Sequence, residues 1–115
     1  ASLILVMRQT ARVPQSGGMK IVNYATYIDS QEKVAALRPA HREYMTQLRA
    51  EGRLVVGGPF TDGSGALFIY ETESLAAAEQ VVAADPYHVG GAYASYQLSP
   101  WEIVKANPAL IPALP

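Results

Sequence analysis

Apolar and polar positions change their spacing several times along the chain, and each change predicts a new element. Residues 20–28 are rich in β-branched and aromatic side chains, which is typical of a strand. Similar stretches predict strands over 53–60, 66–71 and 93–104. The turn residues in 61–65 separate the second and third of these strands, which we therefore expect to form a hairpin.

Helical spacing fills the intervals between the strands. Ser30 can cap a short helix over 31–37, and a second helix is expected from Pro39 to about Glu51. The break between them is predicted because proline disfavours helical geometry in the residue before it. An alanine-rich stretch from Leu75 to about Ala84 predicts a further helix.

The resulting order, β-α-β-β-α-β, defines the expected fold class. It is an α+β, ferredoxin-like arrangement with an antiparallel sheet and helices on one face. The domain is expected over 19–106, after an N-terminal extension (1–18) and before an extended, poorly packed, proline-rich C-terminal tail (107–115). Because the free sheet face needs a cover, we expect a homodimer, with sheets packed face to face or a barrel shared by two chains.

Residues 1–18 differ in character from the rest of the chain. One interpretation is that the natural protein starts at or near Met19 and that 1–18 is an extension. The other is that the apolar piece Leu3–Met7 adds a strand to a sheet edge or to a partner subunit. The sequence leaves both open.

Composition and charge exclude several classes of function. Half of the residues are apolar, which is enough for a modest core, and nine basic against ten acidic residues give a net charge of −1. This balance provides no surplus of positive charge for nucleic acid. The chain has no cysteine, which excludes disulfides and thiolate metal sites. Since the longest apolar run is too short to cross a bilayer, we expect a cytoplasmic protein without a membrane partner.

His41 is the first candidate for chemistry. It precedes Tyr44, Met45 and Leu48 by three, four and seven residues, so it lies on the same buried stripe of its helix. It is either a core histidine satisfied by neighbouring groups or a general acid or base, because imidazole titrates near neutral pH. Arg38, near the helix start, could hold an anionic group or simply be solvated.

Asp85 is the second candidate. It is expected to end a helix, where a carboxylate meets the negative end of the helix dipole at a cost of roughly 0.3–1 kcal/mol. That placement suggests another partner, although Asp-Pro is also a common turn. If the two helices run antiparallel, Asp85 can lie beside His41 and orient its imidazole.

Two further features carry open alternatives. Gly57-Gly58-Pro59-Phe60 interrupts a strand, and it predicts either a plain bulge or a place where a ligand approaches the backbone closely. His41, Asp85 and His88 could together bind a divalent metal, but no short ligand-spacing motif supports this, and we predict no metal.

These residues, taken in order, resemble the YciI-like (YCII-related domain) family over about 19–105. The resemblance rests on three short pieces: His41-x-x-Tyr44, Gly58-Pro59-Phe60 and Asp85-Pro86-Tyr87. It implies a dimeric α+β barrel with an active site built on the histidine and the aspartate. Where chemistry is assigned in the family, it resembles cofactor-free elimination or isomerisation of small ring compounds. Members often carry an acidic residue before Gly-Pro-Phe, but this chain has Gly57, so no role of that acid carries over.

The sequence therefore predicts a small cofactor-independent enzyme with a His41–Asp85 dyad in a pocket. We expect six residues to contact its small-molecule substrate: Arg38, Tyr44, Gly58, Pro59, Phe60 and Tyr87. The alternative is a non-catalytic module of the same fold that binds a small molecule or serves assembly.

Overall fold

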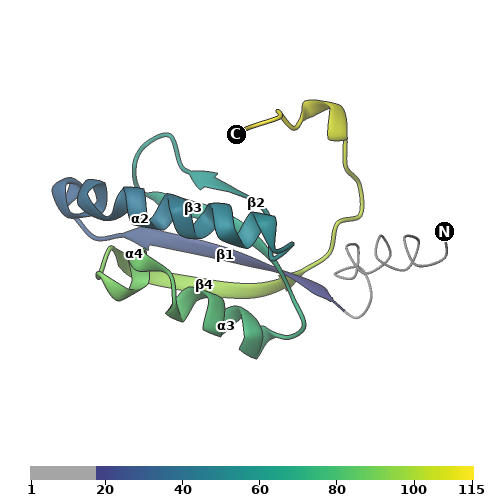
Figure 1. The fold of residues 1–115 in the computed structure, drawn as a ribbon, viewed down its shortest axis with the longest axis horizontal. Helices are drawn as coiled ribbons and strands as arrows, with labels where there is room; N and C mark the ends of the chain where they lie inside the picture. Colours follow the sequence, from purple (N-terminus) through teal and green to yellow (C-terminus); the bar gives the residue numbers. More distant parts are fainter. Residues whose placement is uncertain (1–17) are drawn as a thin grey trace, which may run out of the picture.

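A computed structural model describes residues 18–115, and it contains one four-stranded antiparallel sheet with helices packed on one face (Figure 1). The expectations for residues 1–17 lie outside the described residues. The elements in chain order are β1 (Met19–Tyr27), α2 (Gln31–Ala50), β2 (Leu54–Pro59), β3 (Gly65–Thr72), α3 (Leu75–Ala83), α4 (Pro86–Val89), β4 (Tyr93–Trp101) and the 3₁₀ turn η2 (Pro108–Leu110).

The strand order confirms the expected ferredoxin-like fold. The sheet runs β2-β3-β1-β4, and every neighbouring pair is antiparallel. In the register, Ile21 of β1 lies opposite Tyr70 of β3, while Asn23 of β1 lies opposite Leu98 of β4. Side chains alternate between the faces, so every second residue of β1 and β3 points toward the helices. The two central strands thus carry most of the core.

The core lies between this sheet face and the helices. It contains buried side chains from both layers: Ile21, Leu48, Ala66, Phe68, Tyr70, Ala78, Val81 and Val82. A smaller buried cluster of Val34, Tyr87 and Ala92 packs where α2 meets α4. Burial of such side chains contributes roughly 1.5–3 kcal/mol each, which makes this layer the main source of stability.

The expected break at Pro39 is wrong, because α2 is a single helix that continues through this proline. The Ser30 hydroxyl caps its start by accepting a hydrogen bond from the Lys33 amide (3.3 Å). A proline inside a helix costs about 3 kcal/mol. Burial of Val34 before the proline and Leu48 after it holds both halves on the same sheet face. We attribute the continuity of α2 to this two-sided packing.

The segment around Asp85 also differs from the expectation. α3 ends at Ala83, and Asp85 then begins the one-turn helix α4 instead of closing the helix before it. Its carboxylate accepts a hydrogen bond from the Tyr87 amide (2.9 Å), which is the favourable N-cap arrangement. The expected dipole penalty at this residue is therefore replaced by a stabilising cap.

The last strand is shorter than expected, and the C-terminal tail contains a helical turn that the sequence analysis did not predict. β4 ends at Trp101 and does not reach Val104. The tail (107–115) holds the turn η2, whose start is capped by Asn107 through the Ala109 amide (3.1 Å). The tail then lies beside α2 and β2 (Figure 1). Its side chains remain exposed, as the sequence predicts.

Among residues 18–115, no helix or loop covers the sheet face opposite the helices. Tyr24 of β1, Val56 of β2 and Trp101 of β4 are large exposed apolar or aromatic side chains. Side chains alternate between the two faces along each strand, and the register of the sheet places these three side chains on the face that points away from the core. Within residues 18–115, none of the helices has the length and hydropathy that a membrane span requires.

Candidate active site

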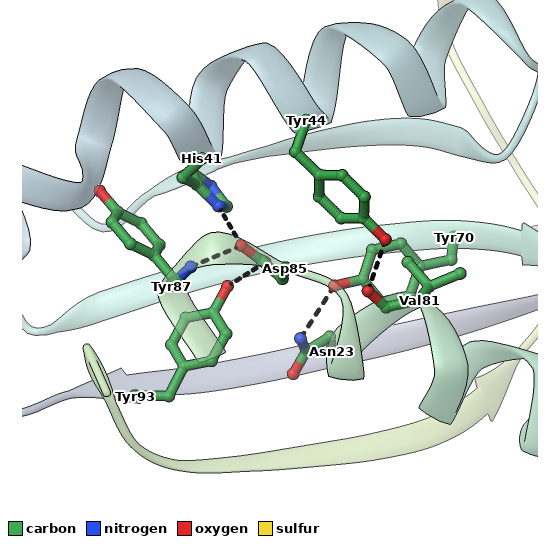
Figure 2. A network of polar contacts seen from close by, with 8 residues as sticks. All are labelled: Asn23, His41, Tyr44, Tyr70, Val81, Asp85, Tyr87 and Tyr93. Atoms are coloured by element: carbon green, nitrogen blue, oxygen red, sulfur yellow. Dashed lines mark hydrogen bonds and ion pairs between the residues drawn. The ribbon is translucent and has the colours of Figure 1, made fainter. Parts of the chain in front are cut away.

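The structure brings His41 and Asp85 together across 44 residues of sequence. The Nδ1 atom of His41, on α2, lies 2.8 Å from Oδ1 of Asp85, which stands at the start of α4 (Figure 2). The exposed fraction is 6% for His41 and 1% for Asp85. Packing of α2 and α4 over the sheet therefore produces a buried imidazole–carboxylate pair.

Asp85 is held by three hydrogen-bond donors. Its Oδ1 accepts hydrogen bonds from Nδ1 of His41 and from the Tyr87 amide. Its Oδ2 accepts a hydrogen bond from the Tyr93 hydroxyl (2.8 Å). Burial, and secondly the negative charge of Asp85, raises the pKa of Tyr93 far above its ordinary value. The phenol thus stays protonated and donates.

This arrangement fixes the form of the His41 ring. A carboxylate at Nδ1 selects the tautomer that carries its proton there and leaves the lone pair on Nε2. The ring stacks on Tyr87 with centroids 3.9 Å apart and lies 5.3 Å from the Phe68 ring. Among residues 18–115, no protein group bonds to Nε2, nor is this atom one of the buried atoms without a partner. His41 is also among the residues that line the cavity described next.

A cavity of about 510 Å³ opens beside His41. Its walls come from the exposed side of α2, from β2 and from the tail. Arg38, Arg42 and Arg49 line it from α2, and none of its lining residues within the described range 18–115 is an aspartate or a glutamate. None of the three forms an ion pair within the described part of the chain. The cavity is positively charged and suits an anionic or oxygen-rich small molecule.

Four of the six expected contact residues line this cavity. Arg38, Gly58, Pro59 and Tyr87 are among its walls, together with His41. Gly58 has open space where a Cβ would stand, which agrees with a wall that a ligand can approach. The glycine pair and proline thus border the site from β2.

The other two expected contact residues, Tyr44 and Phe60, do not line the cavity. The Tyr44 hydroxyl instead donates a 2.6 Å hydrogen bond to the Val81 carbonyl (Figure 2). Phe60 packs on Tyr24 with ring centroids 5.2 Å apart, on the uncovered sheet face. Tyr44 therefore points toward α3, and Phe60 lies at the end of β2 on the other face of the sheet.

Sequence reasoning missed two tyrosines of the site. Tyr93 binds Asp85, and Tyr27 lines the cavity with its ring 5.5 Å from Tyr87. Burial, with the neighbouring Tyr87, raises the pKa of Tyr27 to about 12. Strand alternation alone places both at the ends of strands that meet α4, but it does not distinguish them from the chain's other tyrosines.

The metal alternative does not assemble in the described residues. The His88 ring lies edge-on to Tyr96, with centroids 5.6 Å apart, and has no contact with the His41–Asp85 pair. Within residues 18–115, no three histidine, aspartate or glutamate side chains come together as a ligand set.

Comparison with known proteins identifies the class to which this fold and site belong. The family described as "YCII-related domain" matches residues 19–102. The chain belongs to this family of ferredoxin-like α+β domains. It is 36% identical to protein YciI of Escherichia coli O6:H1 over 86 residues, covering 66% of this chain and 88% of that protein. It is 34% identical to the uncharacterized protein YjpA of Bacillus subtilis over 76 residues, covering 66% and 84%.

Among solved structures, the chain is similar to a dehydrochlorinase. This is 5-chloro-2-hydroxyhydroquinone dehydrochlorinase (TftG) of Burkholderia phenoliruptrix, in complex with 2,5-dihydroxybenzoquinone. The TM-score is 0.65 at 26% identity, covering 73% of this chain and 94% of that one. Rv0793 of Mycobacterium tuberculosis shares the fold alone, with a TM-score of 0.52 at 14% identity, covering 77% and 97%.

Proposed function

We propose that the protein is a small-molecule enzyme that performs cofactor-independent acid–base chemistry with the His41–Asp85 pair. The observation that carries the proposal is the 2.8 Å contact between these buried side chains, of which His41 also lines a cavity. Similarity to a dehydrochlorinase supports an elimination or isomerisation of a small ring compound. Positioned proton transfer of this kind contributes about 10²–10⁴-fold to a rate.

In the proposed mechanism, Nε2 of His41 removes a proton from the substrate. The imidazolium that forms is stabilised by the Asp85 carboxylate at Nδ1. The electron pair left on the substrate then expels a leaving-group anion, which completes an elimination. In an isomerisation, another substrate atom instead takes the proton back from Nε2. Stacking on Tyr87 keeps the ring in one orientation throughout.

The proposed substrate is a small oxygenated ring compound with anionic character. Within residues 18–115, the charged side chains that line the cavity are three arginines of α2, besides His41 when protonated. Guanidinium groups bind phenolate and carboxylate oxygens through paired hydrogen bonds. Arg38 stands three residues before His41, nearly one helical turn away, so it can hold an oxygen while His41 reaches the adjacent atom.

The test uses 5-chloro-2-hydroxyhydroquinone as substrate and measures chloride release. His41→Ala and Asp85→Asn are each expected to lower kcat/KM by about 10²-fold or more, because each removes part of the proton transfer. His88→Ala serves as the matched control and keeps full activity, since His88 lies outside the pair. Full activity in both dyad variants would overturn the mechanism.

A second measurement separates catalysis from binding. Thermal unfolding with 2,5-dihydroxybenzoquinone is expected to show stabilisation by the ligand, reduced by Arg38→Ala. Stabilisation without turnover of any chlorinated or isomerisable ring compound would favour the non-catalytic module of the same fold. Such a module would retain Asp85, because both oxygens of this carboxylate accept hydrogen bonds and one of these bonds caps α4.

We propose that two chains pair through the uncovered sheet face. Tyr24, Val56 and Trp101 expose apolar surface there that a second copy would bury, and closed two-fold pairing satisfies both copies at once. Sedimentation velocity is expected to give a dimer. Tyr24→Glu should shift it to monomer, whereas Val89→Glu, on the exposed end of α4, should not. A monomer at all concentrations contradicts this pairing.

A further inference from the structure

The tail (107–115) makes a specific contact with the helix that carries His41. The Arg49 guanidinium on α2 donates hydrogen bonds from Nη1 to the Leu114 carbonyl (3.3 Å) and to the Pro115 carbonyl (2.9 Å). These bonds join residues 65 and 66 positions apart in sequence. They return the chain from the end of β4 to the helix side of the molecule.

The same tail residues form part of the cavity wall. Ile111, Pro112, Leu114 and Pro115 line the cavity that His41 also lines. The lining residues of α2 run from Arg38 to Arg49, a stretch of about 16 Å at 1.5 Å per residue. His41 stands near one end of this stretch and Arg49 at the other, about 12 Å away along the helix axis. The tail therefore covers the end of the cavity remote from the dyad.

We propose that the tail is a strap that closes the remote end of the cavity and limits which molecules reach His41. The hydrogen bonds donated by Arg49 hold the strap in place. The family match covers residues 19–102, so the strap lies outside the matched region. It gives the site a wall that the ferredoxin-like core does not supply.

The packing of the strap indicates that it can open. Leu110, Ile111 and Leu114 keep 79%, 60% and 70% of their surface exposed, so little apolar burial holds the strap down. Segments with few buried contacts and exposed hydrogen bonds open at low free-energy cost. Pro108, Pro112 and Pro115 restrict the chain, which reduces the entropy lost each time it closes.

The inference rests on the proposed function only in taking the cavity as the ligand site, and its test does not measure turnover. The probe is diethyl pyrocarbonate, which modifies neutral imidazoles, used at about pH 7.5 where most histidines are neutral. The two histidines provide an internal comparison, because His41 reacts only through the cavity whereas His88 is exposed. Peptide mass spectrometry follows the rate at each.

Removal of residues 107–115 is expected to raise the modification rate of His41 by about fivefold or more, the factor that a closure of about 1 kcal/mol imposes. The rate at His88 should not change. Arg49→Ala, in the full chain, should raise the His41 rate in the same direction. Arg53→Ala is the matched control, because this arginine pairs with Glu51 (3.2 Å) and does not line the cavity.

Equal His41 rates in the full chain, the shortened chain and Arg49→Ala would overturn the strap. Circular dichroism melting of each variant establishes that the fold is intact, and Arg49→Ala keeps the test decisive if the shortened chain fails to fold. A chain that shows no turnover but still protects His41 through its tail would refute the proposed enzyme and retain the strap.

Discussion

The Tyr44 hydroxyl donates a 2.6 Å hydrogen bond to the carbonyl oxygen of Val81. Tyr44 lies three residues after His41 on α2, and Val81 lies four residues before Asp85 on α3. The bond therefore ties together the two segments that carry the dyad, at a point close to each member. Burial raises the pKa of Tyr44, so its phenol remains a donor at neutral pH.

Replacing Tyr44 by phenylalanine should destabilise the protein by about 0.5–1.5 kcal/mol, the usual net contribution of one hydrogen bond. The ring is kept, so packing changes little. Urea unfolding of the variant measures the loss. Tyr24→Phe is the matched control, because the Tyr24 hydroxyl forms no hydrogen bond within the described residues and should give no change in the unfolding midpoint. Equal urea midpoints for Tyr44→Phe and Tyr24→Phe would show that the hydrogen bond of Tyr44 does not stabilise the protein.

Tyr93→Phe is expected to cost more than Tyr44→Phe. Its hydroxyl serves a buried carboxylate, and hydrogen bonds to charged groups contribute about 1.5–3 kcal/mol. Tyr96→Phe on the same strand is the comparison, since its hydroxyl meets the exposed Glu79 (3.1 Å) and should contribute nothing measurable. Urea unfolding at neutral pH ranks the two variants. A larger loss for Tyr96→Phe would refute the buried network.

Stability should fall at alkaline pH. Burial is the largest cause of the raised pKa values of Tyr70, Tyr93 and Tyr27, the last to about 12. As the pH passes the ordinary value of 10.0, these tyrosines lose protons in the unfolded chain but keep them in the folded one. The stabilisation is therefore complete below pH 10 and declines above it, by up to about 1.4 kcal/mol per pH unit for each tyrosine.

Urea unfolding from about pH 8 to 11 measures this decline. Tyr93→Phe should start from a lower stability at neutral pH and then decline less steeply, because one titrating group is gone. An unchanged slope in this variant would show that Tyr93 ionises in the folded protein as it does in the unfolded chain.

Gly65→Ala should destabilise the sheet severely, by roughly 2 kcal/mol or more. A Cβ at Gly65 would overlap the Ala25 carbonyl oxygen of the neighbouring strand, so the backbone must move to admit it. Gly58→Ala is the matched control, because nothing lies within 4 Å of the Cβ position there. We expect Gly58→Ala to leave the melting temperature unchanged. Similar losses in the two variants would contradict this difference in space.

The periodicity of the chain was sufficient to predict the fold, because strand and helix patterns alternate without ambiguity and the order of six elements matches one arrangement. It also placed His41 on a buried stripe. It did not predict that α2 passes through Pro39, because that outcome depends on the burial of Val34 and Leu48 by other elements. Local rules describe a proline in isolation, and tertiary packing outweighed them.

The proximity of His41 and Asp85 was predicted from the sequence, whereas several contacts around this pair were not. A histidine on a core stripe and an Asp-Pro turn carry local signals, and the family resemblance connected them. The contacts of Tyr93 with Asp85 and of Arg49 with the tail carry none, because each depends on how distant segments meet. Tyr44 was assigned to the correct helix face, but only the structure shows that its hydroxyl reaches Val81.

One carboxylate at residue 85 carries out two tasks, since it caps the turn that follows and holds the imidazole. A lineage that abandoned the chemistry would still need an oxygen acceptor here to build that turn. The imidazole has no comparable second duty, because an apolar side chain of similar size would fill its space. An aspartate shared among relatives would therefore report on folding, whereas under the proposed function a histidine retained at residue 41 would report on proton transfer.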